Sequence, residues 1–397
     1  SLKIFNLEQS LDLESIRQWM NLVLDNDKKG VSWVNKFERA FKKRFNSKYS
    51  IAVNSGTSGL HAALLAADVG DGDEVIQPSI TVVMDSYVTI HVGAKPVFVD
   101  VDKETWNIDI EKLEKAITPK TKAIITVSLY GLPLQMDKIM QIAKKYNLIV
   151  IDDSAETFLA EYNAALYTNL ADITVYSFEK TKHMTAGSEG GMVTTNNSFL
   201  AEKIRKYAGI GYKGLQADAG RTSLGSEVYQ DPNYERFDTI GFNYRMNAIT
   251  AACGLAQLSI LEDLVNLRQR IGERFLLAIK NCSWMTPQKV SSNLTHTYFS
   301  FGVLYEGENQ RNIQWKDFYK MYKERNGDGF YACWKNPYLE PSLKNKEYGT
   351  QLWGEGLCPN AEYLQKRIMA FKTNYREYEK AEYKISILEK LIDDIGR

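Results

Sequence analysis

The sequence contains few of the side chains that bind metals or form disulfides. Among its 397 residues are 4 cysteines and 4 histidines. None of them shows C-x-x-C or metal-ligand spacing; they are Cys253, Cys282, Cys333, Cys358, His61, His91, His183 and His296. We therefore expect a protein of the reducing cytoplasm that binds no metal ion.

The sequence also lacks an excess of charge of either sign. Its 49 basic residues balance 49 acidic residues, so no chain-wide positive field attracts nucleic acid or an anionic membrane. No apolar run approaches the roughly 18 residues of a membrane-spanning helix. The N-terminal segment Ser1–Asn6 lacks the basic-then-apolar order of a secretory signal. We expect neither nucleic acid nor a membrane as a partner.

From about residue 50 to residue 210, short β-rich runs alternate with helical patterns. This alternation is typical of an α/β domain with a mostly parallel sheet. Helical spacing over Ile110–Ile117 and Met136–Tyr146 predicts crossover helices. Continuous apolar runs predict strands that are covered on both faces, at Glu74–Gln77, Pro96–Val99, Ala123–Leu129, Leu148–Ile151 and Ile173–Phe178.

The pattern changes after this region. Residues 211–240 show no clear period, and a loop of this length usually binds something. A helix is predicted over Met246–Lys280, followed by a tyrosine- and tryptophan-rich segment and an amphipathic C-terminal helix with Ile385, Leu388, Ile392 and Ile395 on one side. We expect a large domain over 1–245, and the linking helix with a small domain over 246–397. The aromatic residues between Tyr298 and Tyr338 are expected in the core and interfaces, with stacking on a sugar ring as the alternative.

The first chemical feature is a loop of small residues, Asn54–Gly59, that opens into an apolar helix. The free backbone N–H groups at a helix N-terminus bind anions, and Thr57 and Ser58 add hydroxyl donors. The loop predicts a phosphate site, although plain helix capping is an alternative explanation. The sequence matches neither a P-loop nor a dinucleotide-binding fingerprint.

Two further features follow predicted strands. The apolar strand that ends at Ile151 continues into Asp152, Asp153 and Glu156, and a buried carboxylate there needs a cationic partner. The strand that ends near Ser177 leads to a turn with lysines and glycines, where a protected lysine can form a Schiff base. Acids that cap the next segment and lysines on a solvated surface are the ordinary alternatives.

These features occur in order at the mouth of the same predicted sheet. Together they provide a phosphate cup, an acid for a ring nitrogen and a lysine for an aldehyde. These are the three groups through which proteins hold pyridoxal phosphate.

With these motifs, the sequence resembles the sugar aminotransferases of the DegT/DnrJ/EryC1/StrS family, which are fold type I pyridoxal-phosphate enzymes. The resemblance extends over nearly the whole chain and includes Gly72–Ile76, Gly93–Asp100, Ile240–Met246 and Leu357–Glu362. It implies a large α/β domain with a mostly parallel sheet and a smaller C-terminal α+β domain.

The resemblance also implies roles for single residues. Asp153 faces the pyridine nitrogen, Ala155 packs beneath the ring and Glu156 lies near the phenolic oxygen. The phosphate is held by Thr57, Ser58, Ser177 and, from the neighbouring subunit, Asn243, so the enzyme is a homodimer with shared active sites. Arg245 is either a contact for the carboxylate of the amino donor or a structural residue of the dimer interface.

The sequence departs from the family pattern at two places. Val82 follows Thr81 where the family has an aromatic residue that stacks on the pyridine ring. Ser188 is an extra residue between Gly187 and Glu189. Because of this insertion, the family spacing counted forward from Ser177 leads to Lys182, and the spacing counted back from Glu189 leads to His183.

We assign the Schiff-base lysine to Lys182, because Ser177 ends a strand and fixes the forward count. In addition, Lys182–Thr185 keep the family's order of lysine, any residue, apolar residue and threonine. Lys180 and a reaction based on His183 are the alternatives, since the sibling sugar 3-dehydratases have histidine at the lysine position. His183 is otherwise expected to be a neighbour of the substrate.

The resemblance implies an aminotransferase that moves an amino group from L-glutamate or L-glutamine to a keto-deoxy sugar. In this family the sugar is most often nucleotide-linked, and the product serves surface-polysaccharide or amino-sugar biosynthesis. Residues of the 211–240 segment are candidates for contacts to the acceptor's phosphates: Tyr212, Lys213, Arg221 and Arg236. The alternatives are a pyridoxal-phosphate-dependent sugar 3-dehydratase and a non-catalytic regulator on the same scaffold.

Overall fold

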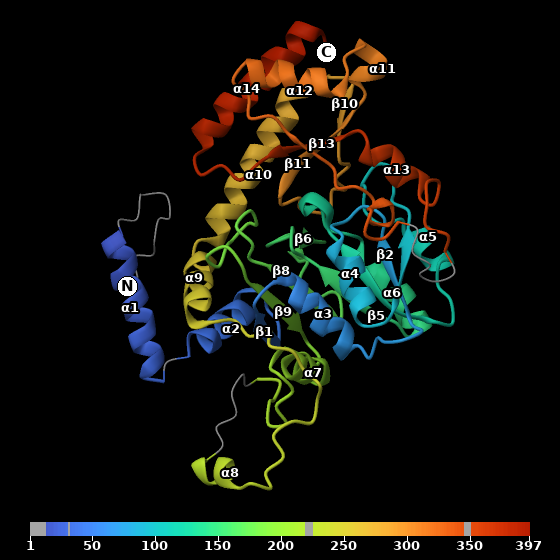
Figure 1. Cartoon of the computed structure of the whole chain (residues 1–397). Coiled ribbons are helices and arrows are strands. Elements are labelled where there is room, and N and C mark those ends of the chain that lie inside the picture. The colour runs from blue at the N-terminus through green and yellow to red at the C-terminus, as the bar shows by residue number, and fades with distance from the viewer. Residues whose placement is uncertain (1–12, 31, 219–224, 345–350) are drawn as a thin grey trace.

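The computed structural model describes residues 13–30, 32–218, 225–344 and 351–397 (Figure 1). A large part contains a seven-stranded sheet, and a smaller part, at the top of Figure 1, contains a four-stranded sheet. A third sheet has two short strands, β6 (Glu161–Tyr162) and β7 (Ala165–Leu166). The fold is therefore the α/β arrangement that the sequence predicts.

The large sheet has the strand order β1-β9-β8-β5-β4-β2-β3. Strands β3, β2, β4, β5 and β8 run parallel to one another, and β9 is antiparallel to both β8 and β1. The bounds are β1 Tyr49–Val53, β2 Glu74–Pro78, β3 Lys95–Val99, β4 Thr121–Val127, β5 Ile149–Asp153, β8 Ile173–Ser177 and β9 Gly191–Thr195. The five predicted strands are confirmed, whereas β1 and β9 were not predicted.

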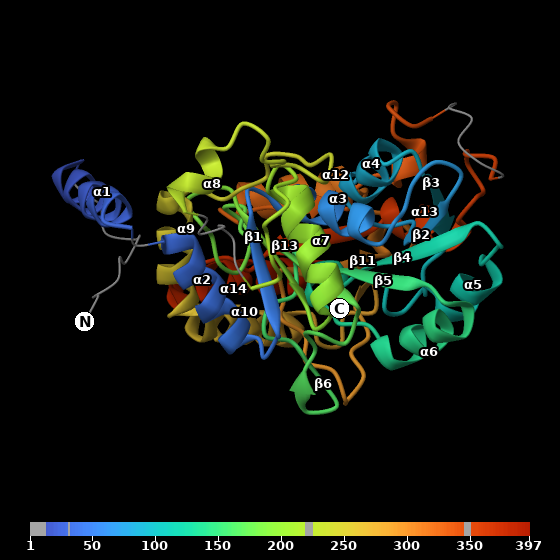
Figure 2. The ribbon, with the colours of Figure 1, turned by 90° about the horizontal axis from the view of Figure 1, so that it is seen from below.

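Helices cover both faces of the large sheet, as Figure 2 shows. Two consecutive residues of β4 belong to different hydrophobic clusters, one on each face of the sheet. Ile125 packs in a cluster with Leu60 of α3, and Ile124 packs in another cluster with Ile139 of α6. This explains why the strands are apolar without alternation. The helices of this part are α1 Leu13–Lys28, α2 Trp33–Arg44, α3 Gly56–Ala66, α4 Met84–His91, α5 Ile110–Lys115, α6 Met136–Tyr146, α7 Ser198–Ala208 and α8 Ser226–Gln230.

The helix predicted over Met246–Lys280 is two helices, which corrects the sequence-based prediction. Helix α9 (Ala248–Leu258) and helix α10 (Leu261–Ala278) meet at an angle of 60°. At the break, the Ser259 hydroxyl donates to the carbonyl of Ala256 at 2.7 Å, a local bond that competes with helix continuation. The bend lets α9 pack against α2 while α10 packs against α14 of the small part.

Among the described residues, no single helix has the length and apolar character needed to cross a membrane. Helices α9 and α10 meet that test only when they are taken together across their bend.

The small part is an antiparallel sheet covered by helices. Its strands are ordered β10-β11-β13-β12, and the C-terminal helix buries Ile385, Leu388 and Ile392 completely, as its predicted amphipathic pattern requires. Most aromatic residues between Tyr298 and Tyr338 are buried or half-buried, but Tyr319, Tyr331 and Trp334 are exposed. The elements are β10 Met285–Pro287, β11 Ser300–Tyr305, α11 Gly307–Arg311, α12 Trp315–Glu324, β12 Tyr331–Ala332, α13 Pro359–Gln365, β13 Ile368–Lys372 and α14 Tyr378–Ile395. The domain boundary at residue 245 stays a prediction.

A buried ion pair connects three elements of the large part. Arg205 of α7 donates to the two carboxylate oxygens of Glu38 of α2, at 3.0 and 3.2 Å. The Ala52 N–H of β1 donates to the same carboxylate at 2.8 Å, and Arg205 also donates to the Ser50 carbonyl at 3.1 Å. Because both side chains are almost fully buried, neither charge can be left alone without a large cost.

We expect Arg205→Met to lower the free energy of unfolding by about 3–5 kcal/mol, because it leaves the Glu38 carboxylate buried without its partner. Urea denaturation followed by circular dichroism measures this change. The double variant Glu38→Gln/Arg205→Met should recover part of the loss. A single variant as stable as the original protein would show that the pair does not hold these elements together.

Candidate active site

A cavity of about 900 Å³ lies where the carboxyl ends of the parallel strands meet the small part. Residues that follow β1, β2, β4, β5 and β8 line one side, and residues of the small part line the other. Parallel α/β sheets bind ligands at this edge. The wall includes Gly56, Thr57, Val82, Tyr130, Asp153, Ala155, Glu156, Ser177, Lys182, Phe299, Tyr331, Trp334 and Lys372.

One end of the cavity has the geometry of an anion site. Helix α3 begins at Gly56, so the backbone N–H groups of its first turn have no partner within the helix. Ser55 caps the helix by accepting the Ser58 N–H at 3.1 Å. Thr57 and Ser177 line the cavity beside this helix start, as the sequence predicts for a phosphate site.

Two glycines allow this end to form. A Cβ atom at Gly191 would lie 2.6 Å from the carbonyl carbon and oxygen of Ser55. A Cβ atom at Gly56 would lie 3.0 Å from the Cβ of Ser177. Strand β9, which contains Gly191, can therefore approach the start of α3 only without a side chain at this position.

Asp153 ends β5 and is almost fully buried in the cavity wall. Its carboxylate accepts the N–H of Ala155 at 3.0 Å. Burial raises the pKa of Asp153 to about 6, although the Ala155 N–H and the nearby Lys182 both oppose that shift. Asp153 is thus a carboxylate above about pH 6, available to a cationic group in the cavity.

Lys182 extends into the same cavity. Its Nζ lies 3.5 Å from Oε1 of Glu156 and 4.3 Å from the centre of the Phe299 ring. Glu156 in turn accepts the backbone N–H of Tyr130 at 2.9 Å, and Tyr130 has a positive φ of 57°. Such a backbone conformation is costly for a tyrosine.

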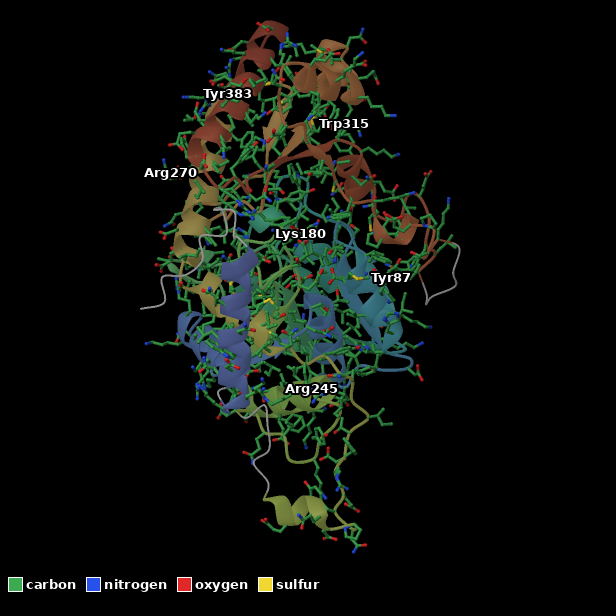
Figure 3. All side chains as sticks on the ribbon, turned by 60° about the vertical axis from the view of Figure 1, so that its left-hand side comes forward. Tyr87, Lys180, Arg245, Arg270, Trp315 and Tyr383 are labelled. Atoms are coloured by element: carbon green, nitrogen blue, oxygen red, sulfur yellow. The ribbon has the colours of Figure 1, made fainter. Side chains whose placement is uncertain are left out.

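The alternatives to Lys182 do not face the cavity. His183 is buried behind it, where Nε2 lies 2.9 Å from the Thr297 carbonyl oxygen, and burial lowers the pKa of His183 well below its usual value. Its imidazole is therefore neutral at physiological pH. Lys180 is not part of the cavity wall. Figure 3 shows Lys180 at the level where the small part meets the large one.

Ser188 does not shift the register of the lysine turn. It takes a positive φ of 101°, and its carbonyl accepts the Lys180 N–H at 3.1 Å. The inserted residue, Ser188, lies after Lys182 in the chain and does not change the spacing between Ser177 and Lys182. The family spacing counted forward from Ser177 therefore leads to Lys182, the side chain that enters the cavity.

Arg268 of α10 is a residue that the sequence analysis missed. Its guanidinium donates to the carbonyls of Thr181 at 2.8 Å, Lys182 at 3.0 Å and Phe299 at 2.9 Å. Burial lowers the pKa of Arg268 to about 9, so it remains a cation at neutral pH. Arg268 fixes the backbone of Lys182 against the small part. In the sequence, Arg268 lies within the predicted helix Met246–Lys280, and no motif marks it.

Several predicted residues lie away from this cavity. The Ser58 hydroxyl donates to Asn54 at 2.6 Å and is not in the cavity wall. Tyr212, Asn243 and Arg245 line a second pocket of about 600 Å³ beside α7, and Figure 3 shows Arg245 well below Lys180. Lys213 and Arg236 belong to the neighbouring loop, where the Lys213 N–H donates to the Arg236 carbonyl. Arg221 lies outside the described residues.

Val82 lines the cavity at the position where an aromatic residue was expected from the resemblance. The aromatic side chains in the wall come from other elements: Tyr130, Phe299, Tyr331 and Trp334. Val82 offers only an aliphatic surface to a ring.

The donor set of the cavity fits pyridoxal phosphate. The open helix start with Thr57 and Ser177 suits its phosphate, Asp153 suits its ring nitrogen and Lys182 suits its aldehyde. These three groups line one cavity, in agreement with the order of the sequence motifs.

Comparisons with known proteins agree with this geometry. Residues 16–376 match the DegT/DnrJ/EryC1/StrS aminotransferase family. GDP-perosamine synthase of Escherichia coli is 36% identical over 291 residues, which are 72% of this chain and 74% of that protein. UDP-2-acetamido-2-deoxy-3-oxo-D-glucuronate aminotransferase of Pseudomonas aeruginosa is 37% identical over 268 residues, 68% of each chain.

Among solved structures, an aminotransferase from Psychrobacter cryohalolentis has a TM-score of 0.82 and 29% identity, covering 92% of both chains. These findings confirm the family, the fold type, the aminotransferase activity and pyridoxal phosphate as the cofactor. The chain belongs to the DegT/DnrJ/EryC1/StrS aminotransferase family.

Proposed function

We propose that this enzyme transfers an amino group from L-glutamate or L-glutamine to a nucleotide-linked keto-deoxy sugar, for the biosynthesis of a surface polysaccharide or an amino sugar. The observation on which this depends is that Lys182, Asp153 and Glu156 share one cavity beside an anion-binding helix start. The names of the two relatives, one with GDP and one with UDP, support a nucleotide-linked sugar as acceptor.

Bound pyridoxal phosphate supplies an aldehyde and an aromatic ring that withdraws electrons from the substrate's reacting carbon. Thr57, Ser177 and the N–H groups at the start of α3 bind its phosphate and fix its position in the cavity. Asp153 keeps a proton on its ring nitrogen, because a buried carboxylate stabilises a cation beside it.

Lys182 is the residue that moves protons. Its ε-amine takes the proton from the α-carbon of the amino donor and later delivers a proton to the carbon that receives the nitrogen. Glu156, 3.5 Å from Nζ, holds the amine in the cavity, and the Arg268 bonds to the lysine backbone keep the side chain aimed there.

The small-part side of the cavity suits the acceptor sugar. Tyr331 and Trp334 line the cavity yet are 73% and 57% exposed. Exposed aromatic faces at the mouth of a pocket are surfaces on which a sugar or a base can pack. Because Lys182 lies inside the cavity, a sugar that reaches it would leave its nucleotide near this mouth.

We also propose a homodimer in which Asn243 serves the neighbouring active site. Asn243 and Arg245 lie in the second pocket and not in the cavity of their own chain, and the Arg245 Nε donates to Asn243 Oδ1 at 2.9 Å. The same segment exposes Ile240 almost completely and Phe242 partly. A second copy of the chain would cover these apolar residues.

The remaining candidates from the sequence receive less support. A sugar 3-dehydratase would need histidine at the lysine position, whereas Lys182 is the side chain that enters the cavity and His183 is not in its wall. A regulator without activity would have no use for the lysine and acid in one cavity. We therefore favour amino transfer.

We expect L-glutamate or L-glutamine alone to convert the lysine-bound form of the cofactor to its amine form, a change visible by absorbance. Lys182→Ala should abolish the conversion because it removes the amine that moves the proton. The matched variant His183→Asn should keep most of it. Loss of conversion in His183→Asn with retention in Lys182→Ala would favour the dehydratase instead.

We expect the affinity of the apoenzyme for pyridoxal phosphate to decrease below about pH 6, by roughly tenfold per pH unit, because Asp153 becomes protonated there. Isothermal titration calorimetry over a pH series measures this. The cofactor phosphate also titrates in this range, so Asp153→Asn serves as the control and should show a shallower dependence. Identical slopes in both proteins would exclude Asp153 as the titrating group.

We expect Asn243→Ala and Lys182→Ala to complement each other partly when they are mixed. Some mixed dimers would then contain one site with both Lys182 and Asn243. Activity of the mixture, compared with that of each variant alone, is the measurement. Analytical ultracentrifugation is expected to show a dimer, and a fully active monomer would contradict a shared site.

A further inference from the structure

Asp85 directly follows Met84 of the cavity wall and is a buried acid that no part of the proposed function uses. It is the second residue of α4, three positions after Val82 in the cavity wall, and its exposed fraction is 0%. The Thr81 hydroxyl donates to Asp85 Oδ2 at 2.5 Å. The other carboxyl oxygen, Oδ1, is buried and meets no donor in the described part of the chain.

The carboxyl group of Asp85 interacts with that of Asp153, both through its charge and through a side-chain hydrogen bond, and both interactions raise the pKa of Asp85. Two ionised carboxylates that interact in this way, shielded from water, would repel each other strongly. Two carboxylate oxygens also cannot form a hydrogen bond unless one of them carries a proton. The contact therefore requires one proton between the two acids, as in other buried carboxyl pairs.

The surroundings of each acid show which one holds the proton. Asp153 accepts the Ala155 N–H and lies near the positive charge of Lys182, both of which favour its ionised form, while Asp152 and Glu156 oppose it. Asp85 faces the negative charges of Asp153 and Glu156, and only the Thr81 hydroxyl favours its ionised form. Burial and these carboxylates raise the pKa of Asp85 well above its usual value.

We propose that Asp85 is a positioning residue that stays protonated and donates its O–H to Asp153, which it thereby holds as the single carboxylate facing the cofactor's ring nitrogen. The chain Thr81–Asp85–Asp153 then satisfies Oδ1 of Asp85. The pair has one negative charge, which matches the one positive charge of a protonated ring nitrogen. This inference rests on the proposed role of Asp153.

The first test needs no cofactor. Infrared difference spectra of the apoenzyme at pH 8, with ¹³C-labelled aspartate, should show the C=O stretch of a protonated carboxylic acid. At this pH Asp152 and Asp153, whose pKa values are raised to about 6, are both ionised. Asp85→Asn should remove the band, and the matched control Asp152→Asn should retain it. A spectrum without the band, or a band that survives in Asp85→Asn, overturns the proposal.

The second test uses the holoenzyme. Asp85→Asn keeps a neutral N–H donor of the same shape, so its cofactor affinity and the ¹⁵N shift of the bound ring nitrogen should stay close to those of the original enzyme. Asp85→Ala removes the hydrogen bond to a charged group and should weaken cofactor binding by about tenfold or more. If Asp85→Asn is as impaired as Asp85→Ala, Asp85 acts as a carboxylate and the proposal fails.

The two tests separate this proposal from the proposed function. If the enzyme binds no pyridoxal phosphate but shows the infrared band, the role of Asp153 is wrong and the shared proton remains. If the cofactor binds and reacts but the band is absent, only the role of Asp85 is wrong. Asp85→Thr is a further variant that preserves a short hydroxyl donor and should fall between Asn and Ala in cofactor affinity.

Discussion

The active site depends on the convergence of the parallel strands at one edge of the large sheet. Each strand brings its carboxyl end to that edge, so residues far apart in the sequence meet there: Thr57 after β1, Tyr130 after β4, Asp153 at β5 and Ser177 at β8. The antiparallel β9 completes the arrangement, since its Gly191 lies against the loop that begins α3. Without this convergence the acid, the lysine turn and the anion site would be separate surface features.

Burial then makes the charges at this edge interdependent. Lys182 and Arg268 are two cations near this edge, and the charges of Glu156 and Asp153 act on them: Glu156 on both, and Asp153 on Lys182. Removing a group from such a cluster leaves its partner desolvated and uncompensated. Arg268 also links the lysine turn to Phe299 of the small part, so the position of Lys182 depends on how the two parts pack. The small part is therefore involved in placing the lysine as well as in closing the cavity.

The sequence alone was sufficient for the features that depend on local pattern. The continuous apolar strands, the small-residue loop before α3 and the lysine turn each have a period or a composition that a short segment shows by itself. Asp85, Arg268 and strand β9 were not recognised, because their importance comes from contacts with distant residues. Asp85 interacts with Asp153, which lies 68 positions later in the sequence. Arg268 of α10 donates to the backbone carbonyl of Lys182. The bend after α9 was missed because no proline or glycine marks it.

The Ser188 insertion illustrates why a strand end is a better origin for counting than a loop. Ser177 is held in register by β9, with Gly191 opposite it, and Lys182 follows in a turn closed by its own N–H on the Glu179 carbonyl at 2.9 Å. The extra residue falls after that turn, where a positive φ and a bond back to Lys180 absorb it. Counting back from Glu189 crosses the insertion and selects His183, which the fold instead turns toward the Thr297 carbonyl. Hydrogen bonds anchored to the sheet thus determine which side chain reaches the cavity, whatever the length of the loop that follows.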